Sequence, residues 1–407
     1  MNIRLFIAIP AMNENDFIAS TLRAIEQQQC PYPFTVFVCL NQPDIWWTDP
    51  EKEDICVRNQ MLLRDLQNTK VFPVRVIDCC SRGKGWQGKH GGVGWARKTL
   101  WEHIAREATP EDIFVSMDAD TTFSSSYFRT LGDFFVRDTS RNVLSVPYYH
   151  ACTGKDSLDR AMLRYELYMR DFLHNLYNIH SPYAFTALGS AIAIRMRALQ
   201  KIGGITPVKS GEDFYLLQKL RKMSFIHSYL PEYVLPATRF SDRVDFGTGP
   251  ALIKGSRGQW HSYPIYHHSL FKSIADTYAL LPKLYRENIN TPFLDFLQKQ
   301  SRKKHLWQLL RENVPDEKHF IHAFHENADG LRILQFVKQQ HEILNFSDEK
   351  GLYDNSRLFL EKEMPSFFQG ETPLENFTTE QLQILRNQWF LKEMKIRQTQ
   401  DAAQTSA

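Results

Sequence analysis

The sequence lacks a long apolar run. A helix that spans a bilayer needs about 20 consecutive, mostly apolar residues, and no stretch of this chain reaches that length. The apolar run near the start, in MNIRLFIAIP, is too short for the apolar core of a secretory signal. We therefore expect no transmembrane helix and a cytoplasmic location, with contact at a membrane surface left open.

Cysteine is scarce and irregularly spaced. The 407 residues include six cysteines, none of them beyond Cys152, and no two form a C-x-x-C pair. Disulfide frameworks and structural zinc sites both depend on regular cysteine spacing. Neither is indicated, and we expect reduced thiols.

A strong excess of one charge is also absent. The chain has 49 Lys and Arg against 46 Asp and Glu, a formal net charge of +3. Proteins that bind nucleic acid by neutralising phosphates usually carry a clear basic excess, so no nucleic acid partner is expected. With 43 % apolar residues the composition is that of an ordinary globular chain with a core.

Short apolar runs alternate with amphipathic segments through the first half of the chain. This alternation predicts an α/β fold with a mostly parallel central sheet flanked by helices. Ligands of such sheets bind outside the carboxyl ends of the strands. The expected strands are Ile3–Ile9, Phe34–Leu40, Val74–Ile77, Ile113–Met117, Val143–Val146 and Leu188–Ile194. The main expected helices are Glu51–Leu66, Gly94–Glu107, Lys155–Tyr177 and Gly211–Met223.

The pattern changes after Tyr266, where strand signals stop and helical patterns with mixed charges begin. We expect a first domain over residues 1–262 and a mainly helical C-terminal region over 263–396. The polar tail RQTQDAAQTSA, residues 397–407, is expected to be disordered. The helical region could serve an acceptor, a protein partner or a membrane surface, and the sequence leaves these open.

The segment SRGKGWQGKHGGVGWAR is rich in glycine. Gly83, Gly85 and Gly88 spell G-x-G-x-x-G, the fingerprint of a dinucleotide cradle. However, the motif follows the third strand rather than the first, and Lys-His-Gly-Gly after it cannot open a stable helix. A loop close to phosphate, with Lys84 among its basic side chains, is the favoured interpretation. A solvated loop is the alternative.

Two acidic pairs follow strands or open helices. Asp118 and Asp120 come directly after an apolar run, and two carboxylates that close together favour a cation between them. Oxygen ligands of this kind suit Mg²⁺ or Mn²⁺. The alternative is that Asp120 or Thr121 caps the next helix.

The second pair, Glu212 and Asp213, opens a helix. Asp213 could act as a general base toward an incoming hydroxyl. Acidic residues in a first turn are also favoured by the helix dipole, so capping is the alternative here.

Taken together, these motifs and their order resemble the inverting family 2 glycosyltransferases with the GT-A fold. The resemblance covers about residues 1–250 and rests on four groups of motifs. They are I-P-A-M-N-E at the first strand, G-V-G-W-A-R-K, M-D-A-D, and finally G-S-A-I-A-I-R with G-G-I and G-E-D-F-Y-L. It implies a GT-A-type nucleotide-binding fold.

The resemblance also implies roles for individual residues. The catalytic residues would be Asp213, with Glu212 beside it, and the metal ligands Asp120 and Asp118. The nucleotide would contact Pro10, Asn13, Glu14, Asn41, Asp78, Gly92, Arg97 and Asp118, with Asn41 or Asp78 on the base. Independently of the resemblance, the basic side chains of Lys84, Arg239 and Arg243 are expected to contact the phosphates, although both arginines could equally be surface residues.

The expected function is therefore a metal-dependent inverting glycosyltransferase. It would move a sugar from a nucleoside-diphosphate sugar to the hydroxyl of a glycan, lipid-linked or small-molecule acceptor, in polysaccharide or glycoconjugate synthesis, with Mg²⁺ or Mn²⁺. Two alternatives remain: a nucleotidyltransferase, and a non-catalytic nucleotide- or glycan-binding protein of the same fold.

Overall fold

The computed structural model describes residues 3–88, 90–209, 211–242 and 247–405. The chain divides into two compact units. The sheet unit contains Met1–Met162, Phe185–Gly258 and Arg397–Ala407, and the helical unit contains Leu163–Ala184 and Gln259–Ile396. The helical unit therefore takes a segment from the middle of the chain, which the expected boundary after residue 262 did not include.

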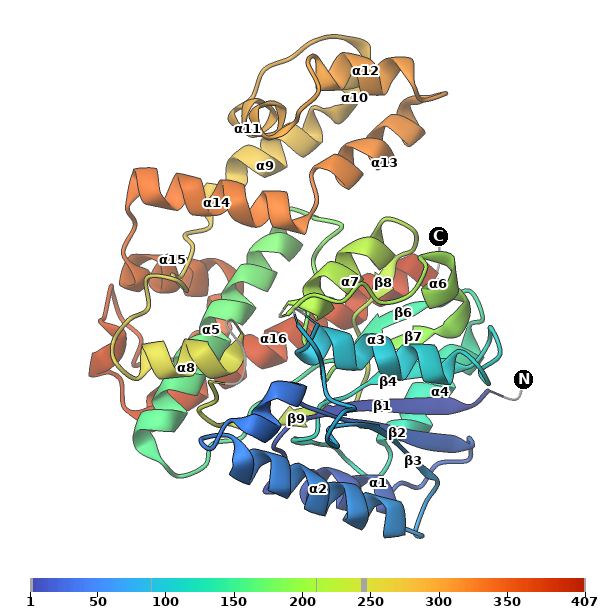
Figure 1. Cartoon of the computed structure of the whole chain (residues 1–407). Coiled ribbons are helices and arrows are strands. Elements are labelled where there is room, and N and C mark those ends of the chain that lie inside the picture. The colour runs from blue at the N-terminus through green and yellow to red at the C-terminus, as the bar shows by residue number, and fades with distance from the viewer. Residues whose placement is uncertain (1–2, 89, 210, 243–246, 406–407) are drawn as a thin grey trace. The chain divides into compact units, whose positions relative to one another are not determined.

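A seven-stranded sheet forms the core of the sheet unit, in the order β3-β2-β1-β4-β7-β6-β8 (Figure 1). All neighbouring strands run parallel except β7, which is antiparallel to β4 and β6. The expected α/β class with a mostly parallel sheet is confirmed. The strands are β1 (Leu5–Ala11), β2 (Phe34–Asn41), β3 (Val74–Cys79), β4 (Ile113–Ser116), β6 (Val143–Ser145), β7 (Ile192–Arg195) and β8 (Ile226–His227).

The central strands are apolar because helices cover the sheet. All seven residues of β1, LFIAIPA, are buried, as are all four of β4. Parallel strands that are buried on both faces read as continuous apolar runs. This explains why β1, β2 and β4 could be predicted at nearly their observed positions.

A second, two-stranded sheet pairs β5 (Thr121–Thr122) with β9 (Leu235–Pro236). Each strand has only two residues, too few for a periodic pattern, and the sequence analysis missed both. The pairing matters for the site because β5 follows Asp120 directly, and the chain after β9 is thereby brought to the same place.

Helices complete both units. Those that begin in the sheet unit are α1 (Ile18–Glu26), α2 (Glu53–Asn68), α3 (Val93–Ile104), α4 (Tyr127–Arg137), α5 (Asp156–Asn178), α6 (Met196–Lys201), α7 (Glu212–Arg221) and α8 (Thr248–Gly255). Those that begin in the helical unit are α9 (Ser269–Ala279), α10 (Leu281–Arg286), α11 (Pro292–Gln300), α12 (Leu306–Glu312), α13 (Glu317–Asn327), α14 (Gly330–Leu344), α15 (Asp348–Leu360) and α16 (Thr379–Thr405). The mainly helical C-terminal region is confirmed. In the described ranges we find no helix whose length and hydropathy would let it cross a bilayer.

Buried ion pairs join α5 to α16 inside the helical unit. Arg170 donates to Glu166 at 2.9 Å and to Glu393 at 2.6 Å, and Arg386 pairs with the other oxygen of Glu166. All four side chains are fully buried. Burying a charge without a partner is costly, so these pairs fix the register of the two helices.

The polar tail is helical, so the prediction of disorder is wrong for residues 397–405. Arg397 is buried and donates to the carbonyl oxygens of Ser145 and Ser228, at 3.1 and 2.7 Å. Asp401 accepts from the backbone N–H groups of Ser228 and Tyr229. The polar side chains of the tail are therefore partners for backbone groups at the edge of the sheet. Residues 406–407 lie outside the described residues.

Replacing Asp401 by alanine should lower the free energy of unfolding by about 2 kcal/mol, because two buried N–H groups lose a charged acceptor. Urea unfolding followed by circular dichroism measures the change. Gln404→Ala, at an exposed position of the same helix, is the control and should leave the midpoint unchanged. An unchanged midpoint for Asp401→Ala would contradict the role given to the tail.

Candidate active site

The first acidic pair lies at the edge of the sheet where β1, β2 and β4 end. Asp118 and Asp120 follow β4 in a turn, in which the Thr121 N–H donates to the Asp118 carbonyl at 3.4 Å. Thr21 of α1 holds the Ala119 carbonyl between them with a 2.9 Å hydrogen bond. The next helix, α4, has its N-cap at Ser126. Asp120 therefore caps no helix, which removes the capping alternative.

Arg97 of α3 connects the two acidic pairs. Its side chain is only 3 % exposed, and its Nε donates to Glu212 Oε1 at 2.8 Å. Its Nη2 contacts Asp118 Oδ1, and its Nη1 contacts the hydroxyl of Ser116, which in turn donates to the Gly189 carbonyl at 2.7 Å. One guanidinium thus binds the corner after β4 and the start of α7.

Glycines allow this arrangement. A Cβ on Gly94 would lie 2.1 Å from the carbonyl oxygen of Val208, in the segment that leads to α7. A Cβ on Gly189 would lie 2.3 Å from Arg97 Nη2. Gly92, the N-cap of α3, has a φ of 85°, in the region that favours glycine. The glycines near α3 thus serve close packing between segments of the protein.

The charges around Arg97 shift the pKa values of its neighbours. Burial alone would lower the pKa of Arg97, but Asp118 and Glu212 outweigh it and raise the pKa above its ordinary value. Burial and the nearby charge of Glu212 raise the pKa of Asp213 to about 7, and Arg97 opposes that rise. Asp213 is half-buried, and its Oδ1 accepts from the Phe214 N–H at 2.7 Å. A carboxyl with this pKa can exchange a proton near neutral pH.

A second arginine, Arg239, holds the other side of the corner. Its Nη2 lies 2.6 Å from Asp120 Oδ2 and 2.9 Å from Glu14 Oε1. Its guanidinium carbon lies 4.1 Å from the centre of the Phe17 ring. The β5–β9 pair delivers Arg239 to this place, since the Ala237 N–H donates to the Asp120 carbonyl at 3.1 Å.

The two arginines and the carboxylates form one continuous network within the sheet unit. Arg97 joins Glu212 to Asp118, and Arg239 joins Asp120 to Glu14. Asp118 and Asp120 are linked through the chain itself. Residues from five separate segments therefore meet at the carboxyl edge of the sheet.

A divalent cation was expected at Asp118 and Asp120. The structure places Arg97 on Asp118, whereas Glu14 and Asp120 direct one oxygen each at the same nitrogen, Nη2 of Arg239. A small cation in the place of that nitrogen would contact both oxygens. The described residues contain no group of three or more His, Cys, Asp or Glu that could hold a metal. Two carboxylates nevertheless suit Mg²⁺ or Mn²⁺, because such ions often take their remaining ligands from phosphate and water.

Asn13 lies just after β1, and Asn41 is the last residue of β2, as expected. Asn41 is buried, and its amide donates to the Ala11 carbonyl at 3.0 Å and accepts from the Trp86 indole at 3.2 Å. Asn13 has a φ of 55°, and among the described residues its buried Oδ1 has no hydrogen-bond partner. Asn13 therefore offers an acceptor to a ligand, whereas the amide of Asn41 already has partners in the protein. Pro10 is buried within β1.

Asp78 organises the glycine-rich segment. Its Oδ1 accepts from the Ser81 N–H at 2.9 Å, and its Oδ2 forms an ion pair with Lys84 at 2.9 Å. Burial alone would raise the pKa of Asp78, but Lys84 and the backbone amides hold it below its usual range. Asp44 accepts from the Gly83 N–H at 2.7 Å. The start of this segment is thus tied to its surroundings by hydrogen bonds and an ion pair, unlike the solvated loop that was the alternative interpretation.

Arg243, an expected phosphate contact, and Lys89, another basic residue of the glycine-rich segment, lie outside the described residues. Two described residues of the network were missed by the sequence analysis as site residues: Ser116 and Gly189. Gly189 stands in the quoted G-S-A-I-A-I-R motif, and a glycine there could have signalled a close approach. Ser116, inside an apolar strand, gave no signal.

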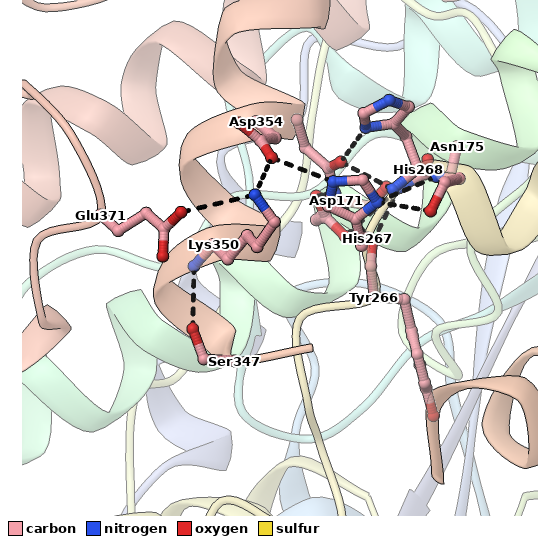
Figure 2. Close-up of polar contacts among 11 residues, drawn as sticks. Asp171, Asn175, Tyr266, His267, His268, Ser347, Lys350, Asp354 and Glu371 are labelled. Carbon is pink, nitrogen blue, oxygen red and sulfur yellow. Dashed lines mark hydrogen bonds and ion pairs between the residues drawn. The ribbon is translucent and has the colours of Figure 1, made fainter. Parts of the chain in front are cut away.

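The helical unit contains a different polar cluster (Figure 2). His267 binds Asp354 through Nε2 at 3.1 Å and the Ser269 hydroxyl through Nδ1 at 2.7 Å; these are the residue types of a nucleophilic triad, but the two ring nitrogens are exchanged. However, the Ser269 N–H donates to the same Nδ1, and the His267 ring stacks on Phe346. Asp354 also pairs with Lys350. The cluster holds the start of α9 against α15, a structural role.

Comparisons with known proteins gave only structural similarities. No protein-family model matches the chain, and no curated protein sequence is similar to it. Residues 1–349 of Staphylococcus aureus TarS in complex with UDP-GlcNAc share 14 % identity at a TM-score of 0.45, covering 98 % of this chain and 92 % of that one. A mannosyltransferase from Pyrobaculum calidifontis, in complex with GDP-Man and Mn²⁺, shares 13 % identity at a TM-score of 0.38, covering 80 % and 87 %. Glucosyl-3-phosphoglycerate synthase from Mycobacterium tuberculosis, in complex with UDP, shares 13 % at 0.35, covering 64 % and 79 %. We therefore derive the function from the residues of the site.

Replacing Arg97 by methionine should lower the free energy of unfolding by about 3 kcal/mol or more, because Glu212 is left as an unpaired buried charge. Urea unfolding measures the loss. Adding Glu212→Gln to the same chain should restore much of it, since the buried charge is then removed. Arg75→Met, at a mostly exposed ion pair, is the control and should change little. Equal stability of Arg97→Met and the parent protein would contradict the network.

Proposed function

We propose that the protein is an inverting glycosyltransferase that uses a nucleoside-diphosphate sugar. One observation carries the proposal: a single ion-pair network brings the corner after β4 and the start of α7 together at the carboxyl edge of the sheet. Ligands of α/β sheets bind at this edge. The arrangement agrees with the roles that the resemblance implies for these residues.

Asp213 is proposed as the general base. Its pKa of about 7 lets it take a proton at neutral pH, as a base must. Glu212 differs, because its carboxylate is buried against Arg97. We therefore assign Glu212 to positioning: it fixes the first turn of α7 and, with it, the carboxyl of Asp213.

The nucleotide is proposed to lie over the ends of β1 and β2. Asn13 Oδ1 is a buried acceptor, and pairing it with an N–H group of the base would remove the cost of leaving it unpaired. Asp118, Gly92 and Arg97 would support the site from the other side. Asn41 and Asp78 would act through Trp86 and Lys84, which they hold.

The proposed reaction is one in-line displacement. The acceptor hydroxyl oxygen forms a bond to the anomeric carbon while the bond from that carbon to the diphosphate breaks. The hydroxyl proton goes to Asp213, and the bonding electron pair leaves with the nucleoside diphosphate. A bound Mg²⁺ or Mn²⁺ would neutralise charge on the leaving diphosphate. Within the chain, Asp120 and Glu14 would hold it, and Lys84 would add positive charge nearby.

The two alternatives differ in their products. A nucleotidyltransferase releases pyrophosphate, whereas a glycosyltransferase releases a nucleoside diphosphate. A non-catalytic binding protein releases neither. The raised pKa of Asp213 favours turnover, because a binding protein has no need for a carboxyl that exchanges protons near pH 7. Product analysis with a panel of nucleoside-diphosphate sugars and acceptors separates the three.

Asp213→Asn should reduce turnover by about 10³-fold, because the amide cannot accept the hydroxyl proton. Donor binding, measured by calorimetry, should stay within about threefold, since the amide keeps the shape of the side chain. Asp65→Asn, at an exposed position of α2, is the matched control. Full activity of Asp213→Asn would refute the assignment of the base.

The pH profile gives an independent test. Because the base must be deprotonated, kcat/KM of the parent protein should rise as pH increases through about 7 and then level off. The residual activity of Asp213→Asn should lack this rise. A parent profile that stays flat from about pH 5.5 to 8 would contradict the assignment, since a group that titrates at its ordinary value near 4 would give such a profile.

A further inference from the structure

Arg239 occupies the place where a cation would contact Asp120. Its Nη2 is shared by Asp120 Oδ2 at 2.6 Å and Glu14 Oε1 at 2.9 Å, so both oxygens converge on one positively charged nitrogen. The side chains of Arg239 and Asp120 are 15 % and 14 % exposed, and that of Glu14 is 7 % exposed. A divalent cation and this guanidinium cannot share the position, because like charges repel at such distances.

Arg97 provides the contrast. Its side chain is only 3 % exposed, and it contacts Glu212 and Ser116 as well as Asp118. Moving it would leave Glu212 as an unpaired buried charge, so it is fixed. The side chain of Arg239 is more exposed than that of Arg97, 15 % against 3 %, and Arg239 follows the short β9 strand. Of these two arginines, Arg239 is the one that can change partners at lower cost.

We propose that Arg239 closes the Asp120–Glu14 site in the free protein and exchanges its carboxylate partners for the donor's diphosphate when the donor binds. A divalent cation then takes the vacated position between Asp120 and Glu14. Cation and diphosphate binding are thereby coupled, because each is favoured by the same movement of Arg239. The part that concerns the diphosphate rests on the proposed function; the competition between Arg239 and the cation does not.

Mn²⁺ binding to the free protein tests the competition directly. Electron paramagnetic resonance measures the free Mn²⁺ in titrations of the parent protein and of Arg239→Gln, without nucleotide. Arg239→Gln should bind Mn²⁺ about tenfold more tightly, because the guanidinium of Arg239 no longer occupies the position between Asp120 and Glu14. Arg75→Gln removes an arginine from a mostly exposed ion pair. It corrects for the change in overall charge and should match the parent protein.

Repeating the titrations with UDP or GDP tests the exchange. Either nucleotide should increase the Mn²⁺ affinity of the parent protein more than that of Arg239→Gln. In the parent protein the diphosphate binds Arg239 and so removes it from the carboxylates, whereas the variant has no arginine at this position. If, without nucleotide, Arg239→Gln binds Mn²⁺ no more tightly than the parent protein does, the proposed competition between Arg239 and the cation is wrong. The same holds if neither protein binds Mn²⁺. An equal effect of the nucleotide on both would overturn the exchange.

The outcomes also separate this inference from the proposed function. If Asp213→Asn abolishes turnover but Arg239→Gln binds Mn²⁺ no more tightly, the glycosyltransferase stands and the inference falls. If Arg239→Gln tightens Mn²⁺ binding but no nucleoside diphosphate binds and no sugar is transferred, the competition stands and the proposed function falls, together with the exchange that rests on it.

Discussion

A positive charge buried between two acidic corners is the constraint on which the site depends. The turn after β4 and the first turn of α7 both present carboxylates to the same space, and they would repel each other without a cation between them. Arg97 is that cation, and it is part of the fold. Its position requires α3 to pack closely against the segment before α7, which is why glycines cluster at the start of α3.

The difference between the two arginines has a physical origin. Arg97 extends from the middle of a helix packed on the central sheet, with partners on three sides. Arg239 follows a strand of only two residues and stacks on a single ring, that of Phe17. We therefore regard Arg97 as a permanent part of the core and Arg239, in the proposal above, as the arginine that exchanges its partners.

The sequence was sufficient for most strands of the sheet, although not for β8, and for the location of Asp118 and Asp120. Continuous apolar runs predicted β1, β2 and β4, and parallel strands bring their carboxyl ends to one edge, so the sequence alone places Asp118 there. The β5–β9 pair could not be predicted, because two-residue strands leave no periodic signal. Without it, nothing in the spacing between Asp120 and Arg239 indicates that they are neighbours.

The tail, residues 397–405, shows that a polar composition alone does not predict disorder. Two of its polar residues, Arg397 and Asp401, bind backbone groups of the sheet unit, and composition alone cannot distinguish this from disorder. The role of Glu14 was obscured for a similar reason. A lone glutamate after a strand suggests contact with a ligand, but it gives no sign of the ion pair with Arg239, which lies far along the sequence.

The return of α16 to the sheet unit has a consequence for synthesis. Proteins emerge from the ribosome beginning with the N-terminus, and domains generally fold as units. Here the carbonyl groups of Ser145 and Ser228 can accept their hydrogen bonds from Arg397 only after Arg397 has been synthesised. One edge of the sheet unit therefore lacks these hydrogen bonds until the residues of the helical unit have been translated. The sheet unit is fully stabilised only after Arg397 and Asp401 have been translated.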